Sequence, residues 1–210
     1  EGLDPQGIND ARIEGNRLSQ LQGNAILIHQ RLDNASISGN TIDGIGLGAL
    51  VMGEAGSVGS LLVSANRCRN LGLAANVEGT SCAAVQLIRV ERGDFCDNLI
   101  AEVARAAVVS PGITGLRAAG IGQLRINGNR FLGIGPDRSS GEMAAIQILP
   151  PFDRVAIDSN QVERIGDDEQ QKPVNAVWHA IQIAPAALNT SGYYSPAYMV
   201  AAPESAYLLS

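Results

Sequence analysis

The sequence has little of what usually assigns a chain to a functional class. No apolar run in it approaches the roughly 18 residues that a membrane-spanning helix needs. Lys and Arg number only 15 against 21 Asp and Glu, so the net charge is −6, and no basic cluster occurs. Because nucleic acids and anionic membranes are bound through basic surfaces, the sequence predicts neither a nucleic acid nor a membrane as a partner.

Cysteine is also scarce. Cys68, Cys82 and Cys96 are an odd number and contain no CxxC pair, which fits neither a disulfide framework nor a zinc signature. We expect small core or surface residues, and the alternative is one disulfide with a thiol left over. The chain also lacks a nucleotide-binding fingerprint and a supported Ser/His/Asp arrangement, so we expect no metal and no cofactor.

The sequence does contain an internal repeat, and its 45% hydrophobic residues suffice for a packed core. The repeat is centred on Asn16, Asn40, Asn66, Asn98, Asn129 and Asn160. Apolar residues stand three positions before each Asn (Ile13, Ile37, Val63, Phe95, Ile126, Ile157), two positions after (Leu18, Ile42, Cys68, Ile100, Phe131, Val162) and five positions after (Leu21, Ile45, Leu71, Val103, Ile134, Ile165). Such agreement in register identifies a structural unit that recurs six times. We number the coils by these asparagines, from coil one at Asn16 to coil six at Asn160.

The residue before each asparagine is small or turn-forming. These residues are Gly15, Gly39, Ala65, Asp97, Gly128 and Ser159. They predict a bend, in a turn or left-handed conformation, between two strands whose apolar residues face inward. The asparagine can then point inward and bond both the backbone and the asparagine of the next coil. A buried amide without partners would cost about 1–3 kcal/mol, so we expect six satisfied amides stacked as a ladder.

A second strand is expected later in each repeat. The segments are residues 25–29, 49–52, 83–88, 106–109, 144–149 and 180–184. Several alternate between apolar and polar residues with period two, which is typical of strands. Leucine-rich repeats are the alternative, but they usually return through a helix, and Gly follows the +5 apolar residue in four of these repeats. The pattern therefore favours an all-β fold.

With its Asn-centred turns, as in Gly39-Asn40-Thr41-Ile42 and Gly128-Asn129-Arg130-Phe131, the chain resembles the right-handed parallel β-helix superfamily, the pectate-lyase-like coil. The resemblance implies a single-stranded parallel β-helix of about six to seven coils over residues 1–187. Residues 188–210 lose the repeat, and we expect them to be a C-terminal cap over the exposed strand edges or the end of a fragment. Coils would stack about 4.8 Å apart. The short coils, the acidity and the near absence of lysine are also similar to non-enzymatic bacterial β-helix repeat proteins of phage-tail-like or contractile-injection particles.

Extra residues are expected in loops. Coils three, five and six insert residues 72–81, 135–142 and 166–176 just past the +5 apolar residue, so these loops should protrude from one edge. Coil four is expected to place its excess, residues 110–122, after its second strand. Function on solenoids tends to reside in such loops or on an exposed sheet face.

The loops of coils five and six hold the candidate site. The catalytic candidates are Glu142, Asp167 and Asp168, and the binding candidates are Asp137, Arg138, Trp178 and His179. The fold family includes pectate lyases, polygalacturonases and phage tailspike glycanases, which the resemblance offers as guides. In such a site a tryptophan can stack on a sugar ring, and two carboxyl groups can act as acid and base.

We expect a non-enzymatic structural or recognition module of a secreted, cell-surface or phage-tail-like assembly, with a glycan or other chains of the assembly as partner. The alternative is a polysaccharide lyase or glycoside hydrolase that acts from the loops of coils five and six. A homo-oligomer is a further expectation, formed through Tyr193, Tyr194 and Tyr198 near the C-terminus. We expect an extracellular, cell-surface or virion-like location.

Overall fold

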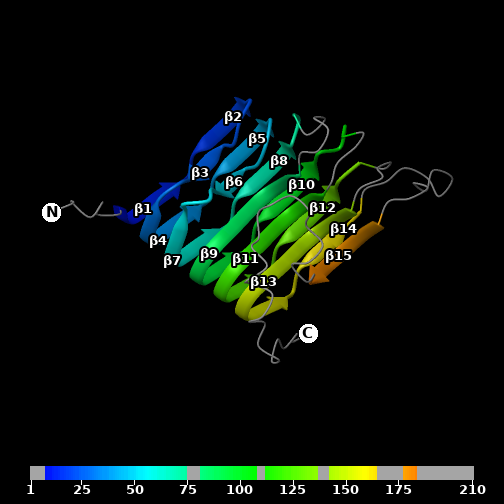
Figure 1. The fold of residues 1–210 in the computed structure, drawn as a ribbon. Coiled ribbons are helices and arrows are strands. Elements are labelled where there is room, and N and C mark those ends of the chain that lie inside the picture. The colour runs from blue at the N-terminus through cyan, green and yellow to red at the C-terminus, as the bar shows by residue number, and fades with distance from the viewer. Residues whose placement is uncertain (1–7, 75–80, 108–111, 137–141, 165–176, 184–210) are drawn as a thin grey trace.

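The computed structural model describes residues 8–74, 81–107, 112–136, 142–164 and 177–183, and in these ranges the chain forms fifteen β-strands in two parallel sheets (Figure 1). The six-stranded sheet holds the short strands that follow each asparagine: β2 (Arg17–Leu21), β5 (Thr41–Ile45), β8 (Arg67–Leu71), β10 (Leu99–Val103), β12 (Arg130–Ile134) and β14 (Gln161–Glu163). The nine-stranded sheet holds β1 (Ile8–Glu14), β3 (Ile26–Ile28), β4 (Arg31–Ser38), β6 (Leu50–Met52), β7 (Ser57–Ser64), β9 (Cys82–Cys96), β11 (Ile113–Asn127), β13 (Glu142–Asp158) and β15 (Val177–Ile183).

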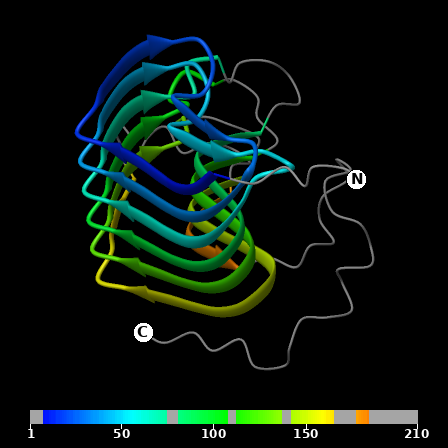
Figure 2. The ribbon, with the colours of Figure 1, turned by 90° about the vertical axis from the view of Figure 1, so that its left-hand side faces the viewer.

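The chain alternates between the two sheets as it winds (Figure 2). In coils one and two the second and third strands of the winding are separate, as β3 and β4 or β6 and β7. From coil three on they merge into the long, bent strands β9, β11 and β13. The fold is therefore a parallel β-helix of about six coils, as the repeat predicts. The leucine-rich alternative is wrong, because the described residues contain no helix.

The pairing register matches the sequence repeat position by position. In the larger sheet Ile37 pairs with Val63, and Val63 pairs with Phe95. In the smaller sheet Ile42 pairs with Cys68, and the residues five positions after the first five asparagines pair in the same way. Most of these side chains are buried, and the few at the ends of the stack are half-buried or exposed. The interior is thus a set of apolar stacks held in line by the two sheets.

The six asparagines form the expected ladder. The backbone N–H and Nδ2 of each one donate to Oδ1 of the next, at 2.9–3.1 Å along the whole series. From the second asparagine on, Nδ2 also donates to the carbonyl of the residue three positions before the preceding asparagine, as Asn66 does to Ile37 O at 2.8 Å. Asn40, Asn66, Asn98 and Asn129 are buried. Each amide therefore joins two coils through its side chain and replaces the hydrogen bonds that the bend removes from the sheet.

The residue before every asparagine is left-handed. The φ angles of Gly15, Gly39, Ala65, Asp97, Gly128 and Ser159 lie between 54° and 68°. A second left-handed position, which the sequence analysis did not foresee, follows each of the first five asparagines by four residues. It is occupied by Gln20, Gly44, Asn70, Glu102 and Gly133, with φ between 52° and 70°. In coils one to five the short strand is therefore bounded by a left-handed residue near each end.

Glu102 offers a test of this second corner, because it is exposed and holds φ at 56° where the corresponding residues of coils two and five are Gly. A left-handed conformation costs a residue with Cβ about 1–2 kcal/mol, and glycine avoids most of that cost. We expect Glu102→Gly to raise the free energy of unfolding by about 1 kcal/mol in urea unfolding. Glu163→Gly, an exposed site within strand β14, should instead lower it. A loss of stability in both variants would contradict the strain argument.

Coil four departs from the prediction. Its second strand was expected at residues 106–109, but Ala107 N–H donates to Ala104 O in a turn, and the strand that pairs with β9 begins at Ile113. Residues 113–122, expected as part of an insertion, belong to β11. Here β11 carries Gly115, where an added Cβ would lie 2.7 Å from Ala145 O. Glycine weakens the sequence signal of a strand, which is why the segment was missed.

With this strand in place, the long connections of coils three to six occupy equivalent positions in their coils. In coils three to six the chain leaves the smaller sheet after β8, β10, β12 and β14 and re-enters the larger one at β9, β11, β13 and β15. The extra residues of all four coils therefore lie in the same connection. The insertions predicted for coils three, five and six are in the expected place, and coil four joins them.

Candidate functional site

The outer side of the second strands carries a row of polar side chains that bond one another across coils; we call it the polar row. Arg117 donates from Nε to Gln147 Oε1 at 2.8 Å and from Nη1 to Ser81 Oγ at 3.4 Å. Gln147 Nε2 donates to Gln182 Oε1 at 2.6 Å, and Gln182 Nε2 donates to Glu142 Oε1. Arg117, Gln147 and Gln182 are direct register partners on β11, β13 and β15. The row therefore repeats with the strand spacing and reaches the connection of coils five and six.

Two of the predicted site residues meet at the end of this row. His179 Nε2 lies 3.6 Å from Glu142 Oε1, with 37% and 44% of the two side chains exposed. Both are therefore open to solvent and close enough for an ion pair when the imidazole is protonated. The remaining polar candidates, Asp137, Arg138, Asp167 and Asp168, lie outside the described residues. So do Tyr193, Tyr194 and Tyr198.

Trp178 faces the opposite way from the polar row. It pairs with Met143, whose side chain is buried, and it packs against the hydrophobic core. Its indole Nε1 donates to Ile134 O at 3.1 Å. Tryptophan thus ties β15 to the end of β12, and only its exposed part is open to a ligand.

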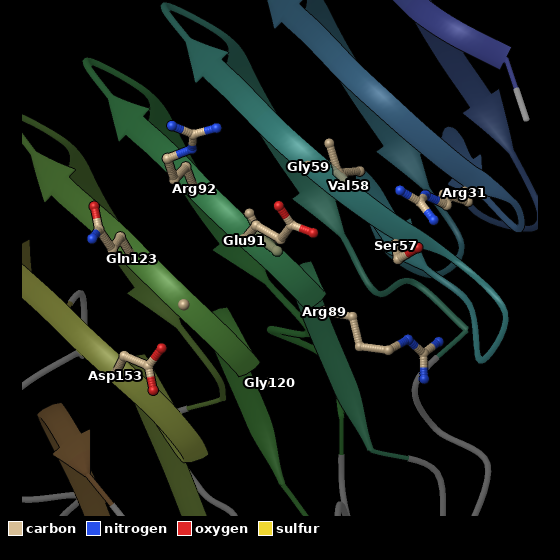
Figure 3. Close-up of a pocket in the computed structure, with 12 residues that line it drawn as sticks. Arg31, Ser57, Val58, Gly59, Arg89, Glu91, Arg92, Gly120, Gln123 and Asp153 are labelled. Carbon is tan, nitrogen blue, oxygen red and sulfur yellow. The ribbon is translucent and has the colours of Figure 1, made fainter. Parts of the chain in front are cut away.

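A second polar surface, absent from the sequence analysis, lies on the outer side of the third strands of the coils. We call it the third-strand face: the outward residues of 31–38, 57–64, 89–96, 120–127 and 152–158. Figure 3 shows Glu91, Arg92, Gln123 and Asp153 projecting from three neighbouring strands there. They line a groove of about 630 Å³ together with Arg31 and Arg89. A second groove, of about 320 Å³, shares Arg92 and Gln123 with it as lining residues. A third groove, of about 360 Å³, shares Ser60, Leu61 and Asp94 with the second.

The polar character of this face comes from a local break in strand alternation. Glu91 and Arg92 are neighbours in the chain, yet both are exposed, because the register pairs Val90 with Ile121 and Arg92 with Gln123 and passes over the residue between. The same skip occurs in β13, where Asp153 and Arg154 are both exposed. Each such coil therefore turns an acid and a base outward side by side.

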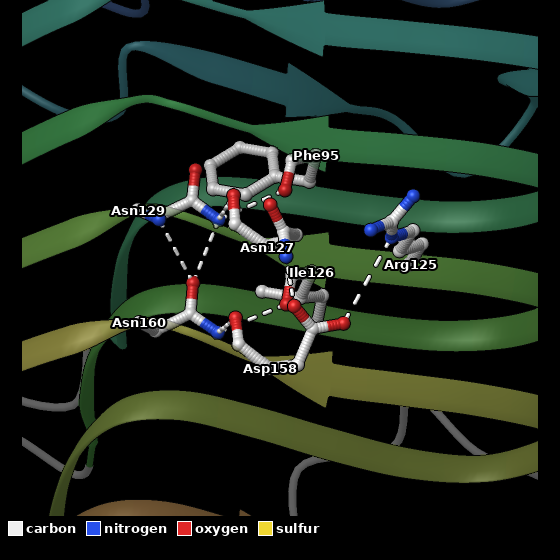
Figure 4. Close-up of polar contacts among 7 residues, drawn as sticks. All are labelled: Phe95, Arg125, Ile126, Asn127, Asn129, Asp158 and Asn160. Carbon is white, nitrogen blue, oxygen red and sulfur yellow. Dashed lines mark hydrogen bonds and ion pairs between the residues drawn. The ribbon is translucent and has the colours of Figure 1, made fainter.

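Farther along the third-strand face, charged residues already have partners. Arg125 Nε lies 3.8 Å from Asp158 Oδ2, and Asn127 Nδ2 donates to Asp158 Oδ1 (Figure 4). Asn127 and Asp158 stand two positions before the ladder asparagines Asn129 and Asn160, so their contact runs parallel to the ladder on the outside of the sheet. Exposed pairs of this kind contribute little to stability.

The three cysteines are free thiols. Burial raises the pKa of Cys68 to about 12. Burial also raises the pKa of Cys82 to about 11, although Arg117 opposes the shift. The pKa of Cys96 is raised as well, first by burial and then by Asp97 and Asp94. The alternative with one disulfide is therefore wrong, and all three side chains stay protonated at neutral pH.

The described residues include no group of three or more His, Cys, Asp or Glu side chains placed to hold a metal ion. None of the described segments forms an apolar helix of membrane-spanning length.

Comparisons with known proteins return no relatives. No protein-family model matches the chain, and neither the curated proteins nor the solved structures give a match. The assignment to the parallel β-helix fold therefore rests on this chain's own geometry: two parallel sheets entered in turn and a buried asparagine ladder.

Proposed function

We propose that the chain is a non-enzymatic β-helix module that presents a glycan-binding surface within a secreted, cell-surface or phage-tail-like assembly. The buried ladder supports the mechanical part of this proposal. Each coil is fixed to the next by sheet hydrogen bonds, by side-chain amides and by apolar stacks, so the outer faces are held at a constant spacing. A surface with that order is suited to a ligand that itself repeats.

The single observation that carries the recognition part is the polar row. Amide and guanidinium groups from three successive coils lie in register, and their mutual hydrogen bonds orient them before a ligand arrives. Sugar hydroxyls both donate and accept hydrogen bonds, so amides are matched partners for them. Groups ordered beforehand lose less conformational entropy on binding. His179, beside Glu142, would complete this surface at coil six.

The test is binding of a panel of neutral and acidic oligosaccharides, followed by calorimetry with the best ligand. We expect Gln182→Ala, which removes the link between Gln147 and Glu142, to weaken binding about tenfold. Gln161→Ala is the matched control, because Gln161 is exposed on the smaller sheet. Absence of any bound glycan, or equal losses in both variants, would contradict the proposal.

One observation favours a second candidate, a polysaccharide lyase or glycoside hydrolase. The contact between Glu142 and His179 joins a carboxyl group to an imidazole at the edge where the loops of coils five and six end, and both groups serve as acids or bases in catalysis. Incubation with the same panel distinguishes the two functions through new reducing ends or unsaturated products. Turnover that disappears in Glu142→Gln would establish the enzyme and overturn the non-enzymatic module.

A further inference from the structure

The third-strand face has a feature that the proposed function does not use: two arginines, on coils three and five, stand on either side of a glutamine on coil four. Arg92 pairs in register with Gln123, and Gln123 pairs with Arg154. All three side chains are exposed. Neither guanidinium makes a hydrogen bond or ion pair within the part of the chain that the structure describes, whereas Arg125 nearby is engaged by Asp158. Two strand spacings, about 9.6 Å, separate the backbones of the two arginines.

Carboxyl groups stand beside both arginines. Glu91 precedes Arg92 and Asp153 precedes Arg154, while the coil between them has Gly122 in that position. The two acids are exposed, and they also lack polar partners among the described residues. Coils three and five thus each carry an acid and a base, and we call these two pairs the walls of a trough. Coil four lies between them and contributes the smaller residue Gly122 and the amide of Gln123, which form its floor. Figure 3 shows Gln123 on the strand between those of Arg92 and Asp153.

The chemistry of this trough points to one class of ligand. A carboxylate on the ligand can bond a guanidinium through two parallel N–H···O bonds, which is the strong geometry for such pairs. Hydroxyl groups of the same ligand can donate to Glu91 and Asp153 and accept from the amide of Gln123. We propose that the third-strand face binds a carboxylate-bearing sugar residue across coils three to five, its carboxylate on Arg92 or Arg154 and its hydroxyls on the neighbouring carboxyl groups.

The acids argue against a denser polyanion. A phosphate backbone would bring several negative charges past Glu91, Asp94 and Asp153, all of which line the grooves. Like charges at that distance repel, so each added charge would offset the gain at the arginines. A glycan with one carboxylate for every two sugars would place one carboxylate near each arginine and hydroxyl groups near each acid. Such a glycan avoids this repulsion.

This site is independent of the polar row. Its residues belong to the second halves of β9, β11 and β13, after the bend, whereas Arg117, Gln147 and Gln182 belong to the first halves and to β15. The polar row and the third-strand face therefore can be disabled separately, and a failure of one leaves the other standing.

The experiment is calorimetry of the full chain with a tetrasaccharide of alternating hexuronate and N-acetylhexosamine, alongside its carboxyl-reduced form and inorganic sulfate. We expect binding of the uronate form, and at least about tenfold weaker binding by the double variant R92Q/R154Q and by the wild type toward the reduced form. R67Q is the matched control, since Arg67 is exposed on the smaller sheet, and Gln182→Ala tests the polar row. Unchanged thermal unfolding of R92Q/R154Q would show that the fold is intact.

Four outcomes of the titrations with the tetrasaccharides would overturn the proposal. They are no binding of the uronate tetrasaccharide, equal binding of its reduced form, an equal loss in R67Q, and a loss in Gln182→Ala that matches the loss in R92Q/R154Q. Binding of sulfate alone with the same affinity would also overturn it, because the hydroxyl contacts would then contribute nothing.

Discussion

Replacing Asn129 with alanine is expected to lower the free energy of unfolding by about 3 kcal/mol or more. Asn129 is fully buried, and its Oδ1 accepts from both the backbone N–H and the Nδ2 of Asn98. Its own Nδ2 donates to Phe95 O, Asn127 O and Asn160 Oδ1. Alanine would leave Asn98 N–H and Phe95 O without these partners inside the structure. Each buried group left unpaired costs about 1–3 kcal/mol, so the losses accumulate.

The measurement is urea unfolding followed by far-UV circular dichroism, with hydrogen exchange of the Asn98 amide as a local readout. Solenoids unfold as coupled neighbours rather than always in one step, so the local readout guards against a partial transition. Asn34→Ala is the control, because Asn34 is exposed and donates only to Asp10. It should cost less than about 0.5 kcal/mol. Similar losses at Asn34 and Asn129 would refute the ladder as a source of stability.

The ladder also shows how far sequence reasoning reached. The positions three before, two after and five after each asparagine were predicted to share faces, and among the described residues the register pairs them one to one. This succeeded because a solenoid repeats one environment per coil, so six copies of a weak local pattern reinforce each other. The left-handed residue near the end of the short strand in coils one to five was harder to predict. Glycine at Gly44 and Gly133 favours that conformation, but Glu102 and Asn70 adopt it as well.

Coil four and the third-strand face were missed for different reasons. The strand at Ile113 is rich in glycine and alanine, which sequence rules assign to loops, whereas the apolar run that ends at Val109 fits a strand better by composition. The outward pairs Glu91-Arg92 and Asp153-Arg154 violate strict alternation, so a period-two reading sends one member of each pair inward. Only the observed skip in the register places both outside. Glu142 and His179 were predicted for one edge, and they lie together there.

The second large effect is expected in the core, where Phe131→Ala should lower the free energy of unfolding by about 3–5 kcal/mol. Phe131 is fully buried in the smaller sheet and stacks on Phe95 of the larger sheet, with ring centroids 6.4 Å apart and planes inclined by 22°. The pair therefore fills the interior between the two sheets beside the ladder. Alanine would open an apolar cavity that water does not occupy, and the surrounding strands are held too rigidly by their register to close it.

The measurement is again urea unfolding, with Leu62→Ala as the control because Leu62 is 39% exposed on the third-strand face. That control should cost less than about 1 kcal/mol. A double variant that also carries Phe95→Ala should lose about 0.5–1.5 kcal/mol less than the sum of the two single losses, since the ring–ring contact is counted twice in that sum. A loss at Phe131 no larger than at Leu62 would mean that the coils collapse around the missing ring. The apolar stacks would then not be what fixes the spacing of the outer faces on which both proposed glycan surfaces depend.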